Sequence, residues 1–165
     1  MFRITLLIPT YNRSRELLRA LQSVAAQQLD PALWECIVVD NASTDDTAEV
    51  VERFAAEHPS LNLRRVFEPC AGVSHARNRG LQEATTPLIA SIDDDERINP
   101  AFLEAYLRFF DTHPEANIAG GKIIAEYPSG RPDWMSRWTE RPIANPMDFG
   151  TQVRPFPKGC LPGGG

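Results

Sequence analysis

The feature that most constrains the fold is an alternation of short apolar runs with longer amphipathic stretches. The apolar runs cover residues 4–8, 36–39 and 88–92, and a weaker strand pattern covers 63–67. Runs of this length that are rich in β-branched residues and leucine predict buried strands. Apolar residues recur at helical spacing after Ser14, after Ser43, over residues 73–84, and between Asn99 and Pro114. Ser43 is the expected N-cap of the second helix.

This alternation predicts an α/β fold, with a mainly parallel sheet covered by helices on both faces. We expect residues 118–127 to form a fifth strand. Right-handed crossovers bring the carboxyl ends of all parallel strands to one edge of the sheet. Ligands bind at that edge, where the strand order reverses. The sequence does not reveal which strands flank this switch point.

Length, charge and cysteine usage exclude several classes of protein. A chain of 165 residues predicts one domain, and a net charge of -5 argues against a nucleic-acid partner. No apolar run approaches the roughly 20 residues that span a bilayer, and no secretory signal is recognisable. Cys36, Cys70 and Cys160 fit no metal, redox or disulfide spacing. We therefore expect reduced thiols and a cytoplasmic location.

Proline and glycine divide the chain into two regions. From Pro128 onward lie seven of the 14 prolines and six of the 10 glycines. We expect a regular α/β region over residues 1–127 and a loop-rich extension over 128–165, mobile near its end. A short helix is expected around Trp134 and Trp138. These two side chains either stack on a sugar or hold the extension down, and their spacing favours neither interpretation.

Polar residues follow three of the expected strands directly. The first strand leads into Pro9, Thr10, Tyr11, Asn12 and Arg13, the second into Asp40 and Asn41, and the fourth into Asp93, Asp94 and Asp95. Because these strand ends share one edge of a parallel sheet, the three clusters are expected to lie together. This edge is therefore the candidate site.

Three consecutive carboxylates repel one another and need a counter-charge. A hard divalent cation such as Mg²⁺ or Mn²⁺, with oxygen ligands, supplies one. In an extended run Asp93 and Asp95 point to one side, so we predict that these two share a metal. The alternative is a solvated acidic turn ahead of the next helix.

The expected third helix begins with basic residues that suit a diphosphate. Arg77 and Arg79 supply the cations, although two exposed arginines on a helix face explain the pattern equally simply. His75 has no second histidine or cysteine at metal spacing and is expected to be a packed or exposed histidine. Neither a glycine-rich dinucleotide fingerprint nor a P-loop is present.

Four motifs in this order resemble glycosyltransferase family 2: Ile-Pro-Thr-Tyr-Asn-Arg, Val-Val-Asp-Asn-Ala-Ser-Thr-Asp, Gly-Val-Ser-His-Ala-Arg-Asn-Arg-Gly and Ile-Asp-Asp-Asp. The resemblance covers about residues 3–127, the nucleotide-binding portion of that family, and implies the GT-A fold with nucleotide-sugar binding. The implied nucleotide-binding residues are Pro9, Thr10, Tyr11, Arg13, Asp40, Asn41, Arg77, Asp93 and Asp94. Asp93 and Asp95 are the implied DxD metal pair, with Asp95 the main ligand of Mn²⁺ or Mg²⁺.

The resemblance implies an inverting, hexosyltransferase-type enzyme. Its donor is a nucleotide-diphosphate sugar, with a UDP-sugar as the leading expectation, and its acceptor is a carbohydrate or a lipid-linked sugar. A cytoplasmic location, or a peripheral one at the inner membrane surface, fits such an acceptor. The alternatives are a nucleotidyltransferase, which would usually carry a glycine-rich phosphate loop after the first strand, and a non-catalytic nucleotide-sugar-binding fragment.

The family's catalytic base lies in an acceptor half that would begin near Gly165. We therefore expect a truncated chain whose base lies beyond Gly165, since none of Glu126, Asp133, Glu140 and Asp148 follows a recognisable strand. Such a chain would bind its donor but transfer sugar slowly or not at all. The apolar surface left by the missing half would be exposed or covered by a second copy, as a homo-oligomer.

Overall fold

The computed structural model describes residues 1–144 and 146–156 of the chain. The chain forms two compact units, Met1–Pro114 and Glu115–Gly165. The first unit contains four strands: β1 (Ile4–Thr10), β2 (Trp34–Asp40), β3 (Leu63–Phe67) and β4 (Leu88–Ser91). Its helices are α1 (Ser14–Ala25), the 3₁₀ turn η1 (Pro31–Leu33), α2 (Thr47–Glu57), α3 (Val73–Glu83) and α4 (Phe102–Thr112). The predicted alternation of strands and helices is confirmed here.

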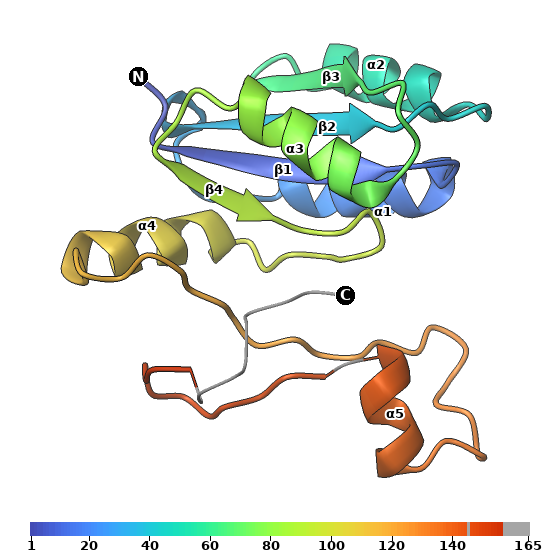
Figure 1. Cartoon of the computed structure of the whole chain (residues 1–165), viewed down its shortest axis with the longest axis vertical. Helices are drawn as coiled ribbons and strands as arrows, with labels where there is room; N and C mark the ends of the chain where they lie inside the picture. Colours follow the sequence, from blue (N-terminus) through green and yellow to red (C-terminus); the bar gives the residue numbers. More distant parts are fainter. Residues whose placement is uncertain (145, 157–165) are drawn as a thin grey trace. The chain divides into compact units, whose positions relative to one another are not determined.

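The four strands form one parallel sheet in the order β3-β2-β1-β4. The chain moves outward from β1 through β2 to β3, then returns to place β4 on the other side of β1 (Figure 1). The order therefore reverses between β1 and β4, which form the switch point. Thr10 pairs with Asp40 in the register of β1 and β2, so these residues end the two strands at one level.

Helices cover both faces of the sheet, as predicted. In Figure 1, α3 lies across one face, and α1 and α2 lie behind the other. Ile4, Leu6 and Ile8 of β1 point into the larger core cluster, which the buried residues of α1, α2 and α4 complete. Leu7 points to the opposite face, in a smaller cluster with Ala76 of α3. The alternation of side chains along a strand explains this division.

Helix α3 approaches the sheet closely because it carries a glycine. A Cβ atom added at Gly80 would collide with the side chain of Leu7, which is almost fully buried. The absence of a side chain at Gly80 therefore lets α3 rest directly on β1. This packing fixes the start of α3 near the carboxyl edge of the sheet.

The second unit contains little regular structure among its described residues. Its helix is α5 (Arg137–Ala144), which begins close to the predicted position but runs on through Pro142. The predicted strand over residues 118–127 is wrong, because its pairing within residues 1–144 and 146–156 is limited to an isolated antiparallel bridge between Ile123 and Met147. The predicted mobility at 163–165 lies outside the described residues, and the functional division at residue 127 remains a prediction.

None of the helices in the described part of the chain is both long and apolar enough to cross a membrane.

Candidate functional site

The ends of β1 and β4 meet at the switch point through a buried hydrogen bond. Thr10, the last residue of β1, donates its hydroxyl to Asp94 Oδ2 at 2.8 Å. Both residues are buried, with exposed fractions of 4% and 5%. Asp94 follows β4 by only three positions, so this bond links the two strands that flank the reversal of order. The site therefore lies where open α/β sheets bind ligands.

Arg13 binds two of the three consecutive carboxylates. Its guanidinium lies 3.1 Å from Asp94 Oδ1 and 2.8 Å from Asp95 Oδ2. The Asp94 carboxylate is almost fully enclosed, whereas Asp95 and Arg13 are half-exposed. Arg13 precedes the first residue of α1, so the short loop after β1 carries it to this edge.

Asp93 pairs with a different arginine. Arg77, in the second turn of α3, donates to Asp93 Oδ1 at 2.9 Å. Two arginines of the chain therefore supply counter-charge to the three carboxylates, where the sequence predicted a divalent metal ion, and the metal remains a prediction. The prediction of an extended run at Asp93–Asp95 is wrong, because the Glu96 N–H donates to the Asp93 carbonyl at 3.1 Å and closes a turn. Alternation along a strand consequently does not apply to these side chains.

Burial disfavours ionisation of two acidic residues in this turn. Burial raises the pKa of Asp94, and the neighbouring charges of Asp95 and Asp93 act in the same direction. The Thr10 hydroxyl and Arg13 oppose that rise. Burial likewise raises the pKa of Glu96, whose Oε2 accepts from the Asp93 N–H at 2.9 Å. Carboxyl groups whose pKa values are shifted by burial and by like charges recur at functional sites.

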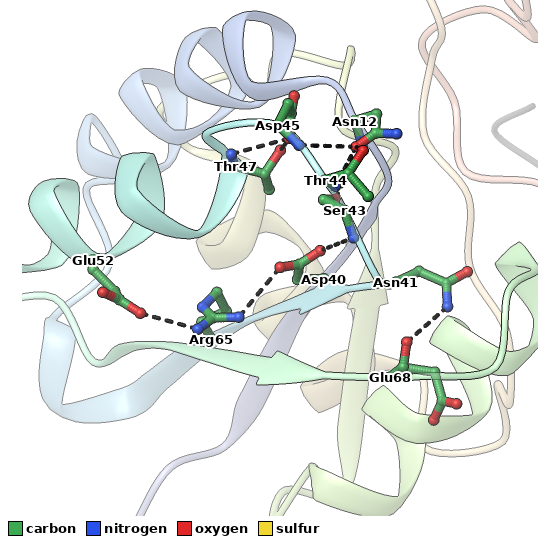
Figure 2. A network of polar contacts seen from close by, with 10 residues as sticks. All are labelled: Asn12, Asp40, Asn41, Ser43, Thr44, Asp45, Thr47, Glu52, Arg65 and Glu68. Atoms are coloured by element: carbon green, nitrogen blue, oxygen red, sulfur yellow. Dashed lines mark hydrogen bonds and ion pairs between the residues drawn. The ribbon is translucent and has the colours of Figure 1, made fainter.

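Asp40 lies at the same edge, and both of its oxygens have partners. Oδ1 accepts from the Ser43 N–H at 2.9 Å, and Oδ2 lies 3.2 Å from the Arg65 guanidinium (Figure 2). Arg65 also pairs with Glu52 of α2 at 3.0 Å. With an exposed fraction of 2%, Asp40 is buried beneath the surface of this edge.

Asn41 uses its carboxamide to hold a neighbouring loop. Its Nδ2 donates to the carbonyls of Glu68 and Cys70 at 3.1 and 2.6 Å, and its Oδ1 accepts from the Gly72 N–H at 2.7 Å. Asn41 therefore ties the end of β2 to the loop between β3 and α3. Sequence reasoning assigned it to the nucleotide, and these contacts show that the protein backbone already uses both ends of the amide.

Asn12 connects the loops after β1 and β2. Its Oδ1 accepts from the backbone N–H groups of Thr44 and Asp45, and its own N–H donates to Ser43 Oγ (Figure 2). Sequence reasoning gave Asn12 no separate role. Two features of the sequence could have indicated this role. Asn12 lies between Tyr11 and Arg13, and asparagine tolerates left-handed backbone in a tight loop.

The remaining predicted residues divide into those near the edge and those away from it. Pro9 is the buried penultimate residue of β1, and Tyr11 follows the strand with an exposed fraction of 53%. Arg79 pairs with Glu83 at 3.0 Å, and this contact is an ordinary ion pair between residues four positions apart in α3. His75 is exposed, which is one of the two alternatives expected from the sequence.

The predicted N-cap at Ser43 is wrong. Helix α2 begins at Thr47 with Asp46 at the N-cap position, and the Thr47 N–H donates to Asp45 Oδ1 at 3.1 Å. Burial raises the pKa of Asp45, but the hydrogen bonds that it accepts from Thr47 and from the Ser14 N–H outweigh burial. The pKa of Asp45 therefore lies below its ordinary value. Ser43 instead belongs to the loop that holds Asp40. The sequence pattern placed the start of the helix too early, because it does not show that the Ser43 N–H donates to Asp40.

The acidic turn has the donor chemistry that a hard cation requires. No group of three or more His, Cys, Asp or Glu side chains in metal-binding geometry occurs within residues 1–144 and 146–156. Asp93 and Asp95 nevertheless present carboxylate oxygens that are partly exposed, at 24% and 48%. Mg²⁺ and Mn²⁺ usually take one or two protein carboxylates and complete their shell with water and phosphate. The residues therefore fit a cation that a bound diphosphate helps to hold.

Two acidic residues of the second unit, Glu140 and Asp148, form ion pairs that make them poor candidates for the catalytic base. Glu140 accepts from Tyr127 and pairs with Arg131, and these contacts lower its pKa. Lys122 lies 2.6 Å from Asp148 and lowers the pKa of that carboxyl. Trp134 and Trp138 have exposed fractions of 68% and 79%, so neither is buried as a staple would be.

A parallel sheet with a charged cluster at its switch point defines an α/β protein with a candidate ligand site at the carboxyl edge. Residues 5–162 match the model of the family Glycosyl transferase family 2. The chain belongs to this family, as the resemblance implied, and the homologous proteins are glycosyltransferases.

Two curated relatives illustrate the similarity. The chain is 29% identical over 113 residues to the poly(ribitol-phosphate) beta-N-acetylglucosaminyltransferase TarS of Staphylococcus aureus, covering 68% of this chain and 20% of TarS. It is 35% identical over 106 residues to validoxylamine A glucosyltransferase of Streptomyces hygroscopicus subsp. limoneus, covering 63% and 23% respectively. The chain thus spans about a fifth of the length of these relatives.

Solved structures confirm the GT-A fold. The crystal structure of S. aureus TarS 1-349 in complex with UDP matches with a TM-score of 0.70 and 28% identity, over 79% of this chain and 38% of that one. The mannosyltransferase PcManGT from Pyrobaculum calidifontis, solved with GDP-Man and Mn²⁺, matches with a TM-score of 0.62 and 33% identity, over 66% and 32%.

Proposed function

We propose that this chain forms the donor-binding part of a metal-dependent, inverting glycosyltransferase that uses a nucleotide-diphosphate sugar. The observation that carries the proposal is the cluster at the switch point, where Asp93, Asp94 and Asp95 lie against Arg13 and Arg77. A diphosphate with a divalent cation matches this mixture, since the cation binds carboxylates and the arginines bind phosphate oxygens. TarS and PcManGT, whose structures contain UDP or GDP-Man, support this ligand class.

Each residue of the cluster has a defined part in donor binding. Asp93 and Asp95 would hold Mn²⁺ or Mg²⁺, which when bound neutralises charge on the leaving diphosphate. Arg13 and Arg77 would donate to phosphate oxygens. Thr10 keeps the Asp94 carboxylate in place, so that Arg13 stays near the phosphates. Asp40, held by Arg65, would lie at the nucleoside end of the bound donor, and the exposed ring of Tyr11 would contact the nucleoside.

The reaction then proceeds by one displacement. The acceptor hydroxyl loses its proton to a carboxylate base and attacks the anomeric carbon, while the bond to the diphosphate oxygen breaks with inversion. We assign no base among Glu140 and Asp148, whose ion pairs lower their pKa values. The acceptor, proposed as a carbohydrate or lipid-linked sugar, and a cytoplasmic or peripheral membrane location remain predictions.

Metal-linked nucleotide binding tests the proposal directly. Isothermal titration with UDP, and separately with GDP, should give tighter binding in Mn²⁺ than in EDTA. Asp95→Asn should remove this difference because it withdraws a carboxylate from the cation while leaving the core untouched. Equal affinity with and without Mn²⁺ in the unaltered protein would contradict the proposal.

A matched charge change provides the control. Glu57 is exposed at the last position of α2, and the carboxyl edge lies beyond the first turn of that helix. Glu57→Gln removes one negative charge, as Asp95→Asn does, and should preserve the effect of Mn²⁺. If both variants lose it equally, the effect reflects net charge rather than a metal site.

A further inference from the structure

Asn12 contacts the loop after β2 through both its carboxamide and its own backbone N–H. Its Oδ1 accepts from the Thr44 N–H at 2.7 Å and from the Asp45 N–H at 3.3 Å (Figure 2). The Thr44 hydroxyl donates to the same oxygen at 3.3 Å. In addition, the Asn12 N–H donates to Ser43 Oγ at 3.0 Å. One side chain and its own backbone thus cross-link two loops that are about thirty residues apart in sequence.

The backbone at this junction adopts an unusual conformation on both sides. Asn12 has a φ of 53° and Ala42 has a φ of 61°, and they are the non-glycine residues with positive φ in the described chain. Asparagine tolerates this left-handed region, whereas alanine occupies it only where surrounding contacts hold it. Ala42 lies between Asn41 and Ser43, each of which is tied to another loop.

The same junction continues to a third loop. Asn41 is buried, and its carboxamide bonds to the backbone of Glu68, Cys70 and Gly72. The loops after β1, β2 and β3 are therefore joined in series through Asn12 and Asn41. The first carries Tyr11 and Arg13, and the second follows Asp40.

We propose that Asn12 is a positioning residue of the nucleotide site: it locks the loop that carries Tyr11 and Arg13 to the loop that holds Asp40. This inference rests on the proposed function. Its oxygen is already used by donors from Thr44 and Asp45, so Asn12 acts through its neighbours rather than by touching the ligand. A pocket whose loops are ordered before binding avoids the cost of ordering them during binding.

Two variants separate the lock from the backbone requirement. Asn12→Gly keeps the left-handed conformation but deletes the carboxamide. Asn12→Asp keeps both that conformation and an acceptor oxygen for the Thr44 and Asp45 N–H groups. If loosening leaves the loops correctly placed a tenth of the time, UDP or GDP with Mn²⁺ should bind Asn12→Gly about tenfold more weakly. Asn12→Asp should stay within about threefold of the unaltered protein, measured also at about 0.5 M NaCl to screen its added charge.

A second asparagine supplies a matched control. Asn62 Nδ2 donates to the carbonyls of Pro31 and Trp34 at 2.7 and 3.2 Å, so it also ties loops through backbone contacts. It lies before β3, at the amino edge of the sheet. Both Asn62→Ala and Asn12→Gly should lower the midpoint of urea unfolding. At a temperature where every variant is folded, Asn62→Ala should leave nucleotide affinity unchanged.

The outcomes separate this inference from the proposed function. If the unaltered protein binds neither UDP nor GDP with Mn²⁺, the proposed function fails. If it binds and Asn12→Gly binds equally well, or if Asn12→Asp is as weak as Asn12→Gly, the positioning role is overturned. Amide hydrogen exchange decides the lock itself: the Thr44 and Asp45 N–H groups should exchange faster in Asn12→Gly only, and unchanged exchange would overturn the inference whatever the nucleotide results.

Discussion

The Thr10 hydroxyl donates to Asp94 Oδ2 at 2.8 Å, and this bond joins residues that are 84 positions apart. It connects β1 with the acidic turn after β4 at the switch point of the sheet. Because Asp94 is buried and its pKa is raised, its carboxylate depends on the donors that Thr10 and Arg13 provide. The bond therefore couples the core of the first unit to the charged surface where we propose that a diphosphate binds.

Removing this donor should destabilise the protein. Thr10→Val keeps the shape of the side chain but leaves the buried carboxylate short of a hydrogen bond, so the free energy of unfolding should fall by about 1–3 kcal/mol. The loss should grow as the pH rises, because the missing bond stabilised the ionised form of Asp94. Urea denaturation at several pH values measures both effects. Thr112→Val, at an exposed hydroxyl in α4, should change stability by less than about 0.5 kcal/mol.

Glu96 should make the stability of the protein depend on pH. Burial raises its pKa above the ordinary value of 4.5, assisted by Asp93 and Asp95 and opposed by the Asp93 N–H and Arg77. The folded protein therefore holds this proton more tightly than the unfolded chain does. The resulting stabilisation is complete below the unfolded pKa and is lost as the pH rises through the folded pKa.

Glu96→Gln tests this dependence because it keeps an oxygen for the Asp93 N–H and removes the charge. The unfolding free energy of the variant relative to the parent should increase as the pH is raised from about 4 to about 7. Chemical denaturation across that range measures it, with Glu57→Gln as the control for lost charge. A difference that stays flat or falls with pH would show that burial does not govern this carboxyl.

The left-handed backbone at Ala42 should be relieved by glycine. Ala42→Gly removes the Cβ that makes a φ of 61° unfavourable, so we expect stability to rise by about 0.5–1 kcal/mol. Ala105→Gly provides a control of opposite sign, since the same change at an exposed position inside α4 should cost about 0.5–1 kcal/mol. Thermal unfolding of both variants measures the contrast. A loss of stability at both positions would mean that neighbouring contacts, not strain, dominate at Ala42.

Two arginines in α3 should differ in their effect on ligand binding. Arg77 pairs with Asp93 at the carboxyl edge, whereas Arg79 pairs with Glu83 in its own helix. Arg77→Ala should weaken binding of UDP or GDP with Mn²⁺ by about tenfold, or 1.4 kcal/mol, because a phosphate partner is lost. Arg79→Ala removes the same charge and should leave affinity nearly unchanged. Equal losses in the two variants would point to long-range electrostatics instead.

Periodicity and strand-end chemistry determined the architecture of the first unit. Short β-branched runs between amphipathic segments predicted four parallel strands, and the structure confirms them with the polar clusters of Thr10, Asp40 and Asp94 on one edge. These features are local, because side-chain alternation and helical spacing are set by neighbours within a few residues. The prediction of a fifth strand at 118–127 is wrong because a local pattern forms a strand only where a partner strand lies alongside it.

Only the tertiary structure decided which charges and loops meet. The sequence shows Arg13, Arg77 and three consecutive aspartates, but their pairing depends on the placement of β4 beside β1 and on the turn that begins at Asp93. The roles of Asn12 and Asn41 depend equally on loops about thirty residues away. Hydrogen bonds require atoms to lie within about 3 Å, and contacts of that precision between distant segments follow from strand order and packing rather than from any local pattern.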